Sequence, residues 1–541
     1  TVSVLYCGAA MYLKPQPKKE IVPPHVLNAK GALFWTSACF VSFFGICALG
    51  AYSWSVSRKR EMARLRRQDG PKVVVVGGNV AGANAAAALT QFHPDVQVKV
   101  FEPNREIVFY GLVPLACAAH RSYDLRCAGP NTLYGSPTWS VTREAELVPA
   151  AVQTIDPEKN RVIDHNGVQH EYDVLVMACG AQLDFGRVKG LKPDQYDSHR
   201  VVYTPGTVRD SIGTCFEGDI LMTRVPPAHP LHGRSHEGTM IGTMNTVWKY
   251  LDFFGGFMSK ATHLRFMTPD KSISDVLPAK HVNAIEEYWQ ERKIDVHTEM
   301  SLVEVDQKRR VATFLNDATK KKEKINYRLL CVDLPMKAPD VIARNKLDGP
   351  GTGGFVDVDV QTLQHKKYQN VFAIGDCAAL NVARSYGAVY AQTPILAHNV
   401  SQYLAHRELN AKYDGYTSFP IMMSTWRAMW PEFLGSTHRK KLELEQPSFD
   451  ESKHYGHYWD DSDWRYWKGF LQGFYIQSTA NELMHWLVFM RARWCSPHWF
   501  GWPDLDDGKP LPMESAPLLT TGKHAGQDYD YGSHSGQSGF L

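Results

Sequence analysis

The chain has 541 residues, of which 44% are hydrophobic, and its formal net charge is +3. This length allows two or three domains around a large core, and the small net charge argues against nucleic acid as a partner. No two of the 10 cysteines are spaced as zinc ligands, so the sequence predicts neither a disulfide framework nor a metal site.

The N-terminal region begins with residues 1–31, which show no periodicity, and continues into the uncharged segment Ala32–Val56. Because about 20 apolar residues span a bilayer, this segment predicts a transmembrane helix, with a buried core helix as the alternative. A basic linker, residues 57–71, follows it. Positive charge marks the inside face of a membrane, so the bulk of the protein is expected on that side.

The stretch Lys72–Glu102 has the pattern of the first β-α-β unit of a dinucleotide-binding domain. A buried strand, Val73–Val76, runs into a turn of small residues, and a second strand, Val96–Phe101, ends at Glu102. Glycines in such a turn let the backbone approach a pyrophosphate at a helix N-terminus, and the acidic residue can bind a ribose. The candidate ligand-binding residues of the turn are Gly77, Gly78, Asn79, Ala81 and Gly82.

Asn79 departs from the glycine pattern, because it stands where the middle glycine is expected. Asn tolerates left-handed backbone better than most residues do. Its side chain nevertheless takes space where the pyrophosphate should come close. A nucleotide is expected here, although the motif alone does not decide it.

The rest of the chain alternates short apolar runs with helical segments. The helices are expected at Ala83–Gln91, Ala279–Lys293 and Thr393–Leu404, and a β-meander at Thr142–Asp164. An aromatic-rich amphipathic region covers Asp460–Trp502, and the tail after it has a disordered composition. Further strands are expected at Glu171–Gly180, Gly218–Thr223, His263–Met267, near Val296, Arg310–Phe314, Tyr327–Asp333 and Val371–Asp376.

Three segments carry a resemblance to a known family: YDVLVMACGAQLDFGRVKGL, FVDVDVQTLQHKKYQNVFAIGDCAAL and KYDGYTSFP. In their order and residues they resemble the mitochondrial sulfide:quinone oxidoreductases, from about Lys72 to Trp502. The resemblance implies an α/β fold with two Rossmann-like dinucleotide-binding domains of the FAD-dependent pyridine nucleotide-disulfide oxidoreductase type. The expected parts are a lead-in (1–31), a transmembrane helix (32–56), a basic linker (57–71), an FAD-binding domain in two pieces (72–200 and 346–410), a second Rossmann-like domain (201–345), a C-terminal membrane or interface region (411–502) and a tail (503–541).

The resemblance also implies that FAD is the cofactor. The loop glycines would line its pyrophosphate and Glu102 would bind its ribose. Ala178 and Gly180 would pack on the cofactor, and Gly375 and Asp376 would hold its ribityl or pyrophosphate part. Arg384 falls where the family has a lysine near the flavin ring. No NAD(P)H site is expected, because Arg224–Gly233 is rich in Pro and His instead of glycine.

The family oxidises sulfide with two cysteines, and both are missing here. One belongs in the loop that reads RVPPAHPLHGRSHEG, and the other belongs at Phe419. Cys179 and Cys377 are interpreted as small buried residues, and Cys117 as a loop residue. The histidines at 229, 232 and 236 could bind a metal, but a solvated polar loop is the preferred interpretation.

The C-terminal aromatic region has two interpretations. Leu483, Trp486, Leu487 and Met490 share one helical face, as in helices that lie on a membrane surface. Aromatic enrichment is equally typical of protein–protein interfaces.

The leading functional hypothesis is a catalytically degenerate flavoprotein. It would be an accessory or structural subunit of a respiratory-chain complex in the mitochondrial inner membrane, mainly on the matrix side. Membrane lipid and other subunits would be its partners. The alternatives are an active FAD-dependent quinone reductase that oxidises sulfide or another small donor, and a soluble FAD-binding scaffold.

Overall fold

The structure is a computed structural model of the chain. The described residues are 70–108, 134–135, 141–192, 199–201, 218–233, 240–248, 262–277, 279–424, 427–429 and 432–434, with single-residue gaps, and Gly45, Cys47, Gly50 and Trp54. The chain divides into two compact parts, Thr1–Arg58 and Lys59–Leu541. In the first part those four residues are helical.

The predicted membrane helix Ala32–Val56 lies mostly outside the described residues. Among the helices that are described, none is long and apolar enough to cross a bilayer. Residues 1–31, most of 103–140, Asp460–Trp502 and the tail also lie outside the described part of the chain.

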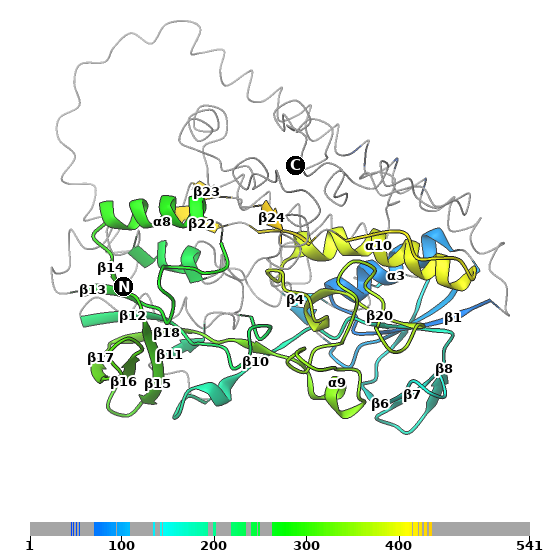
Figure 1. The fold of residues 1–541 in the computed structure, drawn as a ribbon, viewed down its shortest axis with the longest axis horizontal. Helices are drawn as coiled ribbons and strands as arrows, with labels where there is room; N and C mark the ends of the chain where they lie inside the picture. Colours follow the sequence, from blue (N-terminus) through cyan, green and yellow to red (C-terminus); the bar gives the residue numbers. More distant parts are fainter. Residues whose placement is uncertain are drawn as a thin grey trace, which may run out of the picture. The chain divides into compact units, whose positions relative to one another are not determined.

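The first sheet is parallel and has the strand order β20-β9-β1-β2-β5. Its valine-rich central strands are buried on both faces, as parallel strands covered by helices must be. The alanine-rich helix α3 (Val80–Phe92) and the helix α10 (Tyr386–Leu404) pack against each other beside it (Figure 1). The strands are β1 (Lys72–Val76), β2 (Gln97–Phe101), β5 (Glu146–Val148), β9 (Val174–Met177) and β20 (Val371–Ala373).

Smaller elements border this sheet. An antiparallel meander is formed by β6 (Val152–Asp156), β7 (Arg161–Asp164) and β8 (Gln169–Glu171). The meander predicted over Thr142–Asp164 is therefore confirmed only in its second half, because β5 belongs to the parallel sheet. The short helix α9 (Asp340–Arg344) lies against β6. The other short strands are β3 (Ile107–Val108), β4 (Tyr134–Gly135), β21 (Tyr416–Ser418), β22 (Ile421–Ser424), β23 (Arg427–Met429) and β24 (Glu432–Leu434).

The second sheet is also parallel, with the order β11-β18-β12-β13-β14. Helix α8 (Ala279–Glu291) packs on it through Trp289, whose ring lies 5.0 Å from that of Phe266. The strands are β11 (His199–Val201), β12 (Gly218–Arg224), β13 (Thr262–Met267), β14 (Asp295–His297) and β18 (Leu329–Asp333). β11 straddles the predicted domain boundary at residue 200, and the domain limits themselves stay a prediction.

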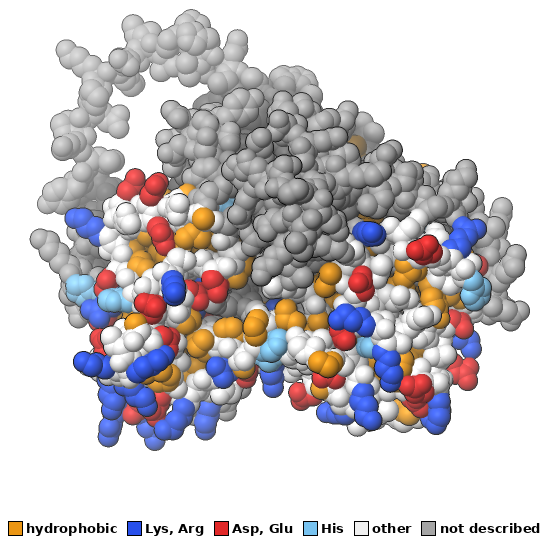
Figure 2. Space-filling view, viewed as in Figure 1, with side chains coloured by type: hydrophobic (Ala, Val, Ile, Leu, Met, Phe, Trp, Pro, Cys, Tyr) orange, Lys and Arg blue, Asp and Glu red, His pale blue; other side chains and the backbone are white. Residues whose placement is uncertain are grey.

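A three-stranded meander follows the second sheet, formed by β15 (Met300–Asp306), β16 (Val311–Asn316) and β17 (Lys322–Asn326). Figure 2 shows Lys and Arg side chains gathered over it. The chain passes from the first sheet to the second at β10 (Gln182–Leu183) and returns at β19 (Met336–Lys337). These two strands pair with each other. The exposed basic residues of the meander are Lys308, Arg309, Lys320, Lys321, Lys322 and Lys324.

Two predicted elements have different limits in the structure. The strand expected over Val371–Asp376 ends at Ala373, because Gly375 adopts φ +71 and starts the 3-10 turn η4 (Gly375–Cys377). The helix expected from Thr393 begins at Tyr386, since Ser385 caps it by accepting from Ala388 N at 3.0 Å. The helix then runs through Pro394 without ending there.

Candidate functional site

The glycines of the first turn are required by the packing of the fold itself. Gly77 has φ +108, and a Cβ at this position would overlap the Ala178 carbonyl oxygen. A Cβ on Gly82 would overlap the carbonyl oxygen of Gly77, and one on Gly78 would lie 2.7 Å from the Glu102 Cβ. These glycines therefore bring β1, α3 and β9 together whether or not a ligand binds.

Asn79 caps the helix that follows the turn. Its side-chain oxygen accepts from Val80 N at 2.8 Å, so it covers part of the N-terminus of α3. Its backbone is extended, with φ −80 and ψ −163. The backbone of Asn79 is therefore not left-handed, so the ability of Asn to adopt that conformation is not used here. Its side chain lies at the helix N-terminus, which is where the sequence predicts interference with a pyrophosphate.

Glu102 is buried, and both of its carboxylate oxygens accept hydrogen bonds. Oε2 accepts from Gly78 N at 2.9 Å, and Oε1 accepts from the backbone N and the side-chain Nδ2 of Asn104 at 2.9 and 2.8 Å. Each carboxylate oxygen has two lone pairs, so one remains on Oε2 for a ribose hydroxyl. Glu102 is placed to bind a ribose, as predicted, but much of the hydrogen-bond accepting capacity of its carboxylate is already used within the protein.

The turn after β20 meets the first turn at the carboxyl edge of the sheet. A Cβ on Gly375 would lie 2.8 Å from the Cβ of Ala81, and Gly375 N donates to Gln392 Oε1 at 2.8 Å. Gly180, at the end of the β9 segment, has φ +71. The structure thus brings the predicted residues of three separate segments to one place, as the crevice of an open α/β sheet requires.

A hollow of about 240 Å³ lies between this turn and the start of α10. Asp376, Arg384 and Gln392 are among the residues that line it. Burial raises the pKa of the Asp376 carboxyl, and the nearby Arg384 guanidinium opposes that rise.

Arg384 is held partly by the loop after β12, which belongs to the part of the chain built around the second sheet, here called the second lobe. Its Nη2 donates to the carbonyl of Leu231 at 2.9 Å, its Nε donates to the carbonyl of Asp376 at 3.5 Å, and its guanidinium lies 4.7 Å from the ring centre of Phe355. These contacts fix the cation beside the hollow. They also tie α10 and its approach to the loop that follows β12.

The histidine loop is packed in the structure instead of solvated. His232 Nε2 lies 2.6 Å from the carbonyl oxygen of Gly353, and its ring meets Phe355 edge-on. His229 Nδ1 accepts from Leu231 N at 3.1 Å. The expectation of a solvated loop is therefore wrong for these two half-buried residues. His236 lies outside the described residues, within which no three His, Cys, Asp or Glu side chains form a metal cluster.

The resemblance places one redox cysteine of the family at Phe419. Phe419 is only 2% exposed, so its ring fills the core at its position. Cys117 lies outside the described residues. Cys377 is buried as expected, but Cys179 is only half-buried. The interaction with the neighbouring Cys377 thiol, followed by burial, raises the pKa of the Cys179 thiol well above its ordinary value.

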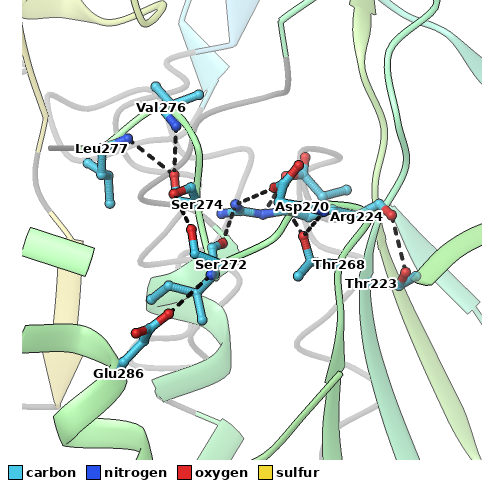
Figure 3. A network of polar contacts seen from close by, with 11 residues as sticks. Thr223, Arg224, Thr268, Asp270, Ser272, Ser274, Val276, Leu277 and Glu286 are labelled. Atoms are coloured by element: carbon cyan, nitrogen blue, oxygen red, sulfur yellow. Dashed lines mark hydrogen bonds and ion pairs between the residues drawn. The ribbon is translucent and has the colours of Figure 1, made fainter. Parts of the chain in front are cut away.

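The carboxyl end of the second sheet is occupied by a buried ionic network (Figure 3). Arg224, fully buried at the end of β12, lies 3.8 Å from Asp333 and 3.9 Å from Asp270. Its Nη1 also donates to the carbonyl of Ile273 at 2.6 Å. The side chain of Thr268 donates to Asp270 at 3.0 Å. The network thus joins the carboxyl ends of β12 and β18 to the segment after β13, at the edge where a nucleotide lies in a Rossmann-like domain.

Comparisons with known proteins agree with this architecture. The family described as Pyridine nucleotide-disulphide oxidoreductase matches residues 71–210. The mouse mitochondrial sulfide:quinone oxidoreductase is 29% identical over 433 residues, which cover 79% of this chain and 88% of the mouse protein. The chain is therefore similar to the mitochondrial sulfide:quinone oxidoreductases over most of its length.

Two solved structures share the fold of this chain. The sulfide:quinone oxidoreductase of Aquifex aeolicus gives a TM-score of 0.57 at 16% identity, covering 74% of this chain and 96% of that one. A chain in the mitochondrial ATP synthase structure of Tetrahymena thermophila gives 0.58 at 21% identity, covering 80% and 99%. Relatedness to mitochondrial sulfide:quinone oxidoreductases points to mitochondria and to an α/β flavoprotein fold.

These relatives imply a flavin cofactor, and the residues of this chain fit FAD only in part. Asp376 and Arg384 border a hollow, and Glu102 keeps one lone pair. At the other end, the Asn79 side chain accepts from Val80 N, one of the N–H groups at the helix N-terminus that a pyrophosphate would need.

Several residues of the site were not predicted from the sequence. Gln392, Phe355 and the partners of Arg224 come from distant segments, so only folding places them together. The sequence held one signal for this network. Arg224 ends an apolar strand and is followed by Val-Pro-Pro, so its charge has no polar loop beside it that would carry it to the surface. Its two acidic partners, each at or just after the end of a neighbouring strand, could have been sought on that basis.

Proposed function

We propose that this chain is a catalytically degenerate relative of sulfide:quinone oxidoreductase that serves as a structural subunit of a mitochondrial inner-membrane complex. The observation that carries the proposal is Phe419, a 2% exposed aromatic side chain where the family places a redox cysteine. Sulfide oxidation needs a thiolate to accept the sulfane sulfur. A buried phenyl ring can neither accept sulfur nor pass electrons by that route.

The second missing thiol strengthens this proposal. The loop after β12, which should carry it, is packed against Gly353 and Arg384 through His232 and Leu231. A loop held in this way resists the movement that would bring a substitute thiol to the hollow. Phe419 and the loop after β12, where the family has its redox cysteines, therefore pack against the rest of the protein in this chain.

We also propose that the second Rossmann-like domain binds no NAD(P)H. The Arg224–Asp333 pair lies at the carboxyl edge where the cofactor would bind, and both side chains are fully buried. Opening that edge would leave a buried charge without its partner, which is strongly unfavourable.

The proposed assembly is of the ATP synthase kind. The Tetrahymena structure supports this choice, since nearly the whole of one of its chains has the fold of this protein. In this proposal Ala32–Val56 anchors the protein in the inner membrane, with the bulk in the matrix and the aromatic region Asp460–Trp502 against lipid or other subunits. The helical state of Gly45, Cys47, Gly50 and Trp54 supports the anchor.

The catalytic half of the proposal is tested with purified full-length protein in detergent. Sulfide-dependent reduction of a short-chain quinone is expected not to exceed the buffer rate, while the mouse enzyme assayed in parallel turns over. A flavin absorption spectrum of the same sample measures FAD occupancy, which is expected to be well below one per chain. Sustained turnover would establish the alternative, an active flavin-dependent quinone reductase, which the hollow beside Asp376 and Arg384 favours.

The assembly half is tested separately. A tagged chain, extracted from mitochondrial membranes with a mild detergent, is expected to migrate on native gels with the intact ATP synthase. Tagged bona fide sulfide:quinone oxidoreductase from the same membranes is the control. Migration of the tagged chain as a free protein of about its own mass would contradict the subunit role.

A further inference from the structure

Two cysteines lie side by side at the floor of the dinucleotide site. Cys179 follows β9, and Cys377 closes the turn η4 after β20. β9 and β20 are neighbouring parallel strands, with Ala373 opposite Met177. Parallel neighbours end at the same edge of a sheet, so the 197 residues of intervening chain do not separate these two positions in space.

The sulfur of Cys377 points back over the end of β9. It lies 3.3 Å from the carbonyl oxygen of Met177 and 3.4 Å from that of Ile374. Ile374 N also donates to the Met177 carbonyl at 3.1 Å, which fixes the turn against the strand. The Cys377 sulfur thus lies beside the backbone two residues before Cys179, near enough for its thiol to raise the pKa of Cys179, and both are free thiols in the structure.

The two cysteines differ in access. Cys377 is fully buried, whereas Cys179 is half-buried and lies between Ala178 and Gly180, at the edge where a cofactor would pack. The Cα of Cys179 would lie 3.0 Å from a Cβ on Gly77, so its backbone is directly beneath the first turn. A reagent that enters the site therefore meets Cys179 before Cys377.

We propose that Cys179 and Cys377 form a redox-active dithiol that a disulfide oxidant, such as glutathione disulfide, converts to an intramolecular disulfide. The Cys179 thiolate attacks one sulfur of glutathione disulfide and releases one glutathione thiolate. The Cys377 thiolate then attacks the Cys179 sulfur and releases the second. Two electrons pass from the protein to the oxidant, and the two thiol protons leave with the two glutathione molecules.

The site favours closure of the pair once exchange has begun. A thiol is a weak donor, so the contacts of Cys377 with two carbonyl oxygens are easily exchanged for a covalent bond. The neighbouring Cys377 thiol, followed by burial, raises the pKa of Cys179, which lowers the thiolate fraction at neutral pH. Exchange is therefore slow at neutral pH and accelerates as the pH rises. The inference goes beyond the proposed structural role, because it holds for the isolated chain.

The test uses the full chain, equilibrated with glutathione disulfide or with reduced glutathione, then alkylated and digested. Mass spectrometry is expected to find a peptide pair joined through Cys179 and Cys377 after oxidation, and two alkylated peptides after reduction. The variant Cys331→Ser removes another buried cysteine, from β18, and is expected to leave the joined pair unchanged. Cys179→Ser is expected to abolish it. Separate alkylation of both cysteines after oxidation would overturn the proposal.

A second measurement uses the native chain, so it does not depend on whether a variant folds. Phenylarsine oxide bridges two thiols that lie within bonding reach of one arsenic atom. Treatment of the native chain is expected to lower later alkylation of Cys179 and Cys377 together by about tenfold, and a small dithiol is expected to reverse this. Unchanged alkylation of the two cysteines would show that the thiols do not meet, and would overturn the proposal on its own.

Discussion

At the residue scale, position 79 lies at the first turn of α3, where the helix presents N–H groups that bind anions. Asn79 uses its side-chain oxygen to accept from Val80 N, within the molecule. Gly77 and Gly82, on either side, are fixed by overlaps with Ala178 and with each other. Of the three glycine positions of the motif, only the one that serves the ligand has changed.

We therefore expect Asn79→Gly to strengthen FAD binding. Glycine removes the covering side chain, while the loss of a cap to glycine costs only a few tenths of a kcal/mol. The expected gain in affinity is about tenfold, equal to about 1.4 kcal/mol. Titration of the full chain with FAD, followed by quenching of flavin fluorescence, measures it.

The matched control at this position is Asn79→Asp. Aspartate keeps the helix cap but adds a negative charge where the pyrophosphate must approach, so no gain in FAD affinity is expected. Equal affinities for the original chain and Asn79→Gly would mean that the side chain does not limit binding.

At the element scale, the end of β12 depends on its two neighbours in the sheet. β18 contributes Asp333 and the segment after β13 contributes Asp270, and both face Arg224. The guanidinium also lies 5.6 Å from the ring centre of Phe266. Burial makes this network sensitive to the loss of one member, because the remaining charge cannot reach water.

Asp333→Ala is accordingly expected to destabilise the second lobe by about 3 kcal/mol. Chemical denaturation followed by near-ultraviolet circular dichroism reports it, because Trp289 packs against Phe266 in that lobe. Glu304→Ala breaks the exposed Lys189–Glu304 pair and is expected to leave the midpoint unchanged. Similar midpoints for both variants would contradict a structural role for the buried network.

Features that arise from local sequence patterns could be predicted, whereas features that depend on contacts between distant residues could not. The strand Val73–Val76, the turn after it and the strand ending at Glu102 are local patterns, and the structure has β1, α3 and β2 there. The Arg224 network and the contact of Cys179 with Cys377 join residues far apart in the chain. The packed state of His232 depends on Gly353 in the other lobe, which no local pattern indicates.

At the scale of the whole molecule, three histidines make stability depend on pH. Burial lowers the pKa of His93, and the neighbouring His398 lowers it further while Asp95 opposes the shift. Burial also lowers the pKa of His398, which Asn410 partly offsets by a hydrogen bond. Burial lowers the pKa of His365, against the opposing effects of the Leu347 carbonyl and of Asp357.

A histidine whose pKa is lowered in the folded state binds its proton more readily when unfolded. Its contribution to stability is complete above the unfolded pKa of about 6.5 and is lost as the pH falls from there toward the folded pKa. Asp376 acts in the opposite sense, because burial raises its pKa and its contribution declines as the pH rises from about 3.8 toward the folded pKa. The histidine effect is therefore measured as a difference between variants, in which the contribution of Asp376 cancels.

We expect the urea midpoint of the full chain to fall more between about pH 7.5 and about pH 5.5 than that of His398→Gln. Glutamine cannot titrate in this range and can still hydrogen-bond to Asn410, the partner that His398 meets at 2.6 Å. If His398→Gln and the original chain lose stability in parallel on acidification, the buried imidazole of α10 is not a source of the pH dependence.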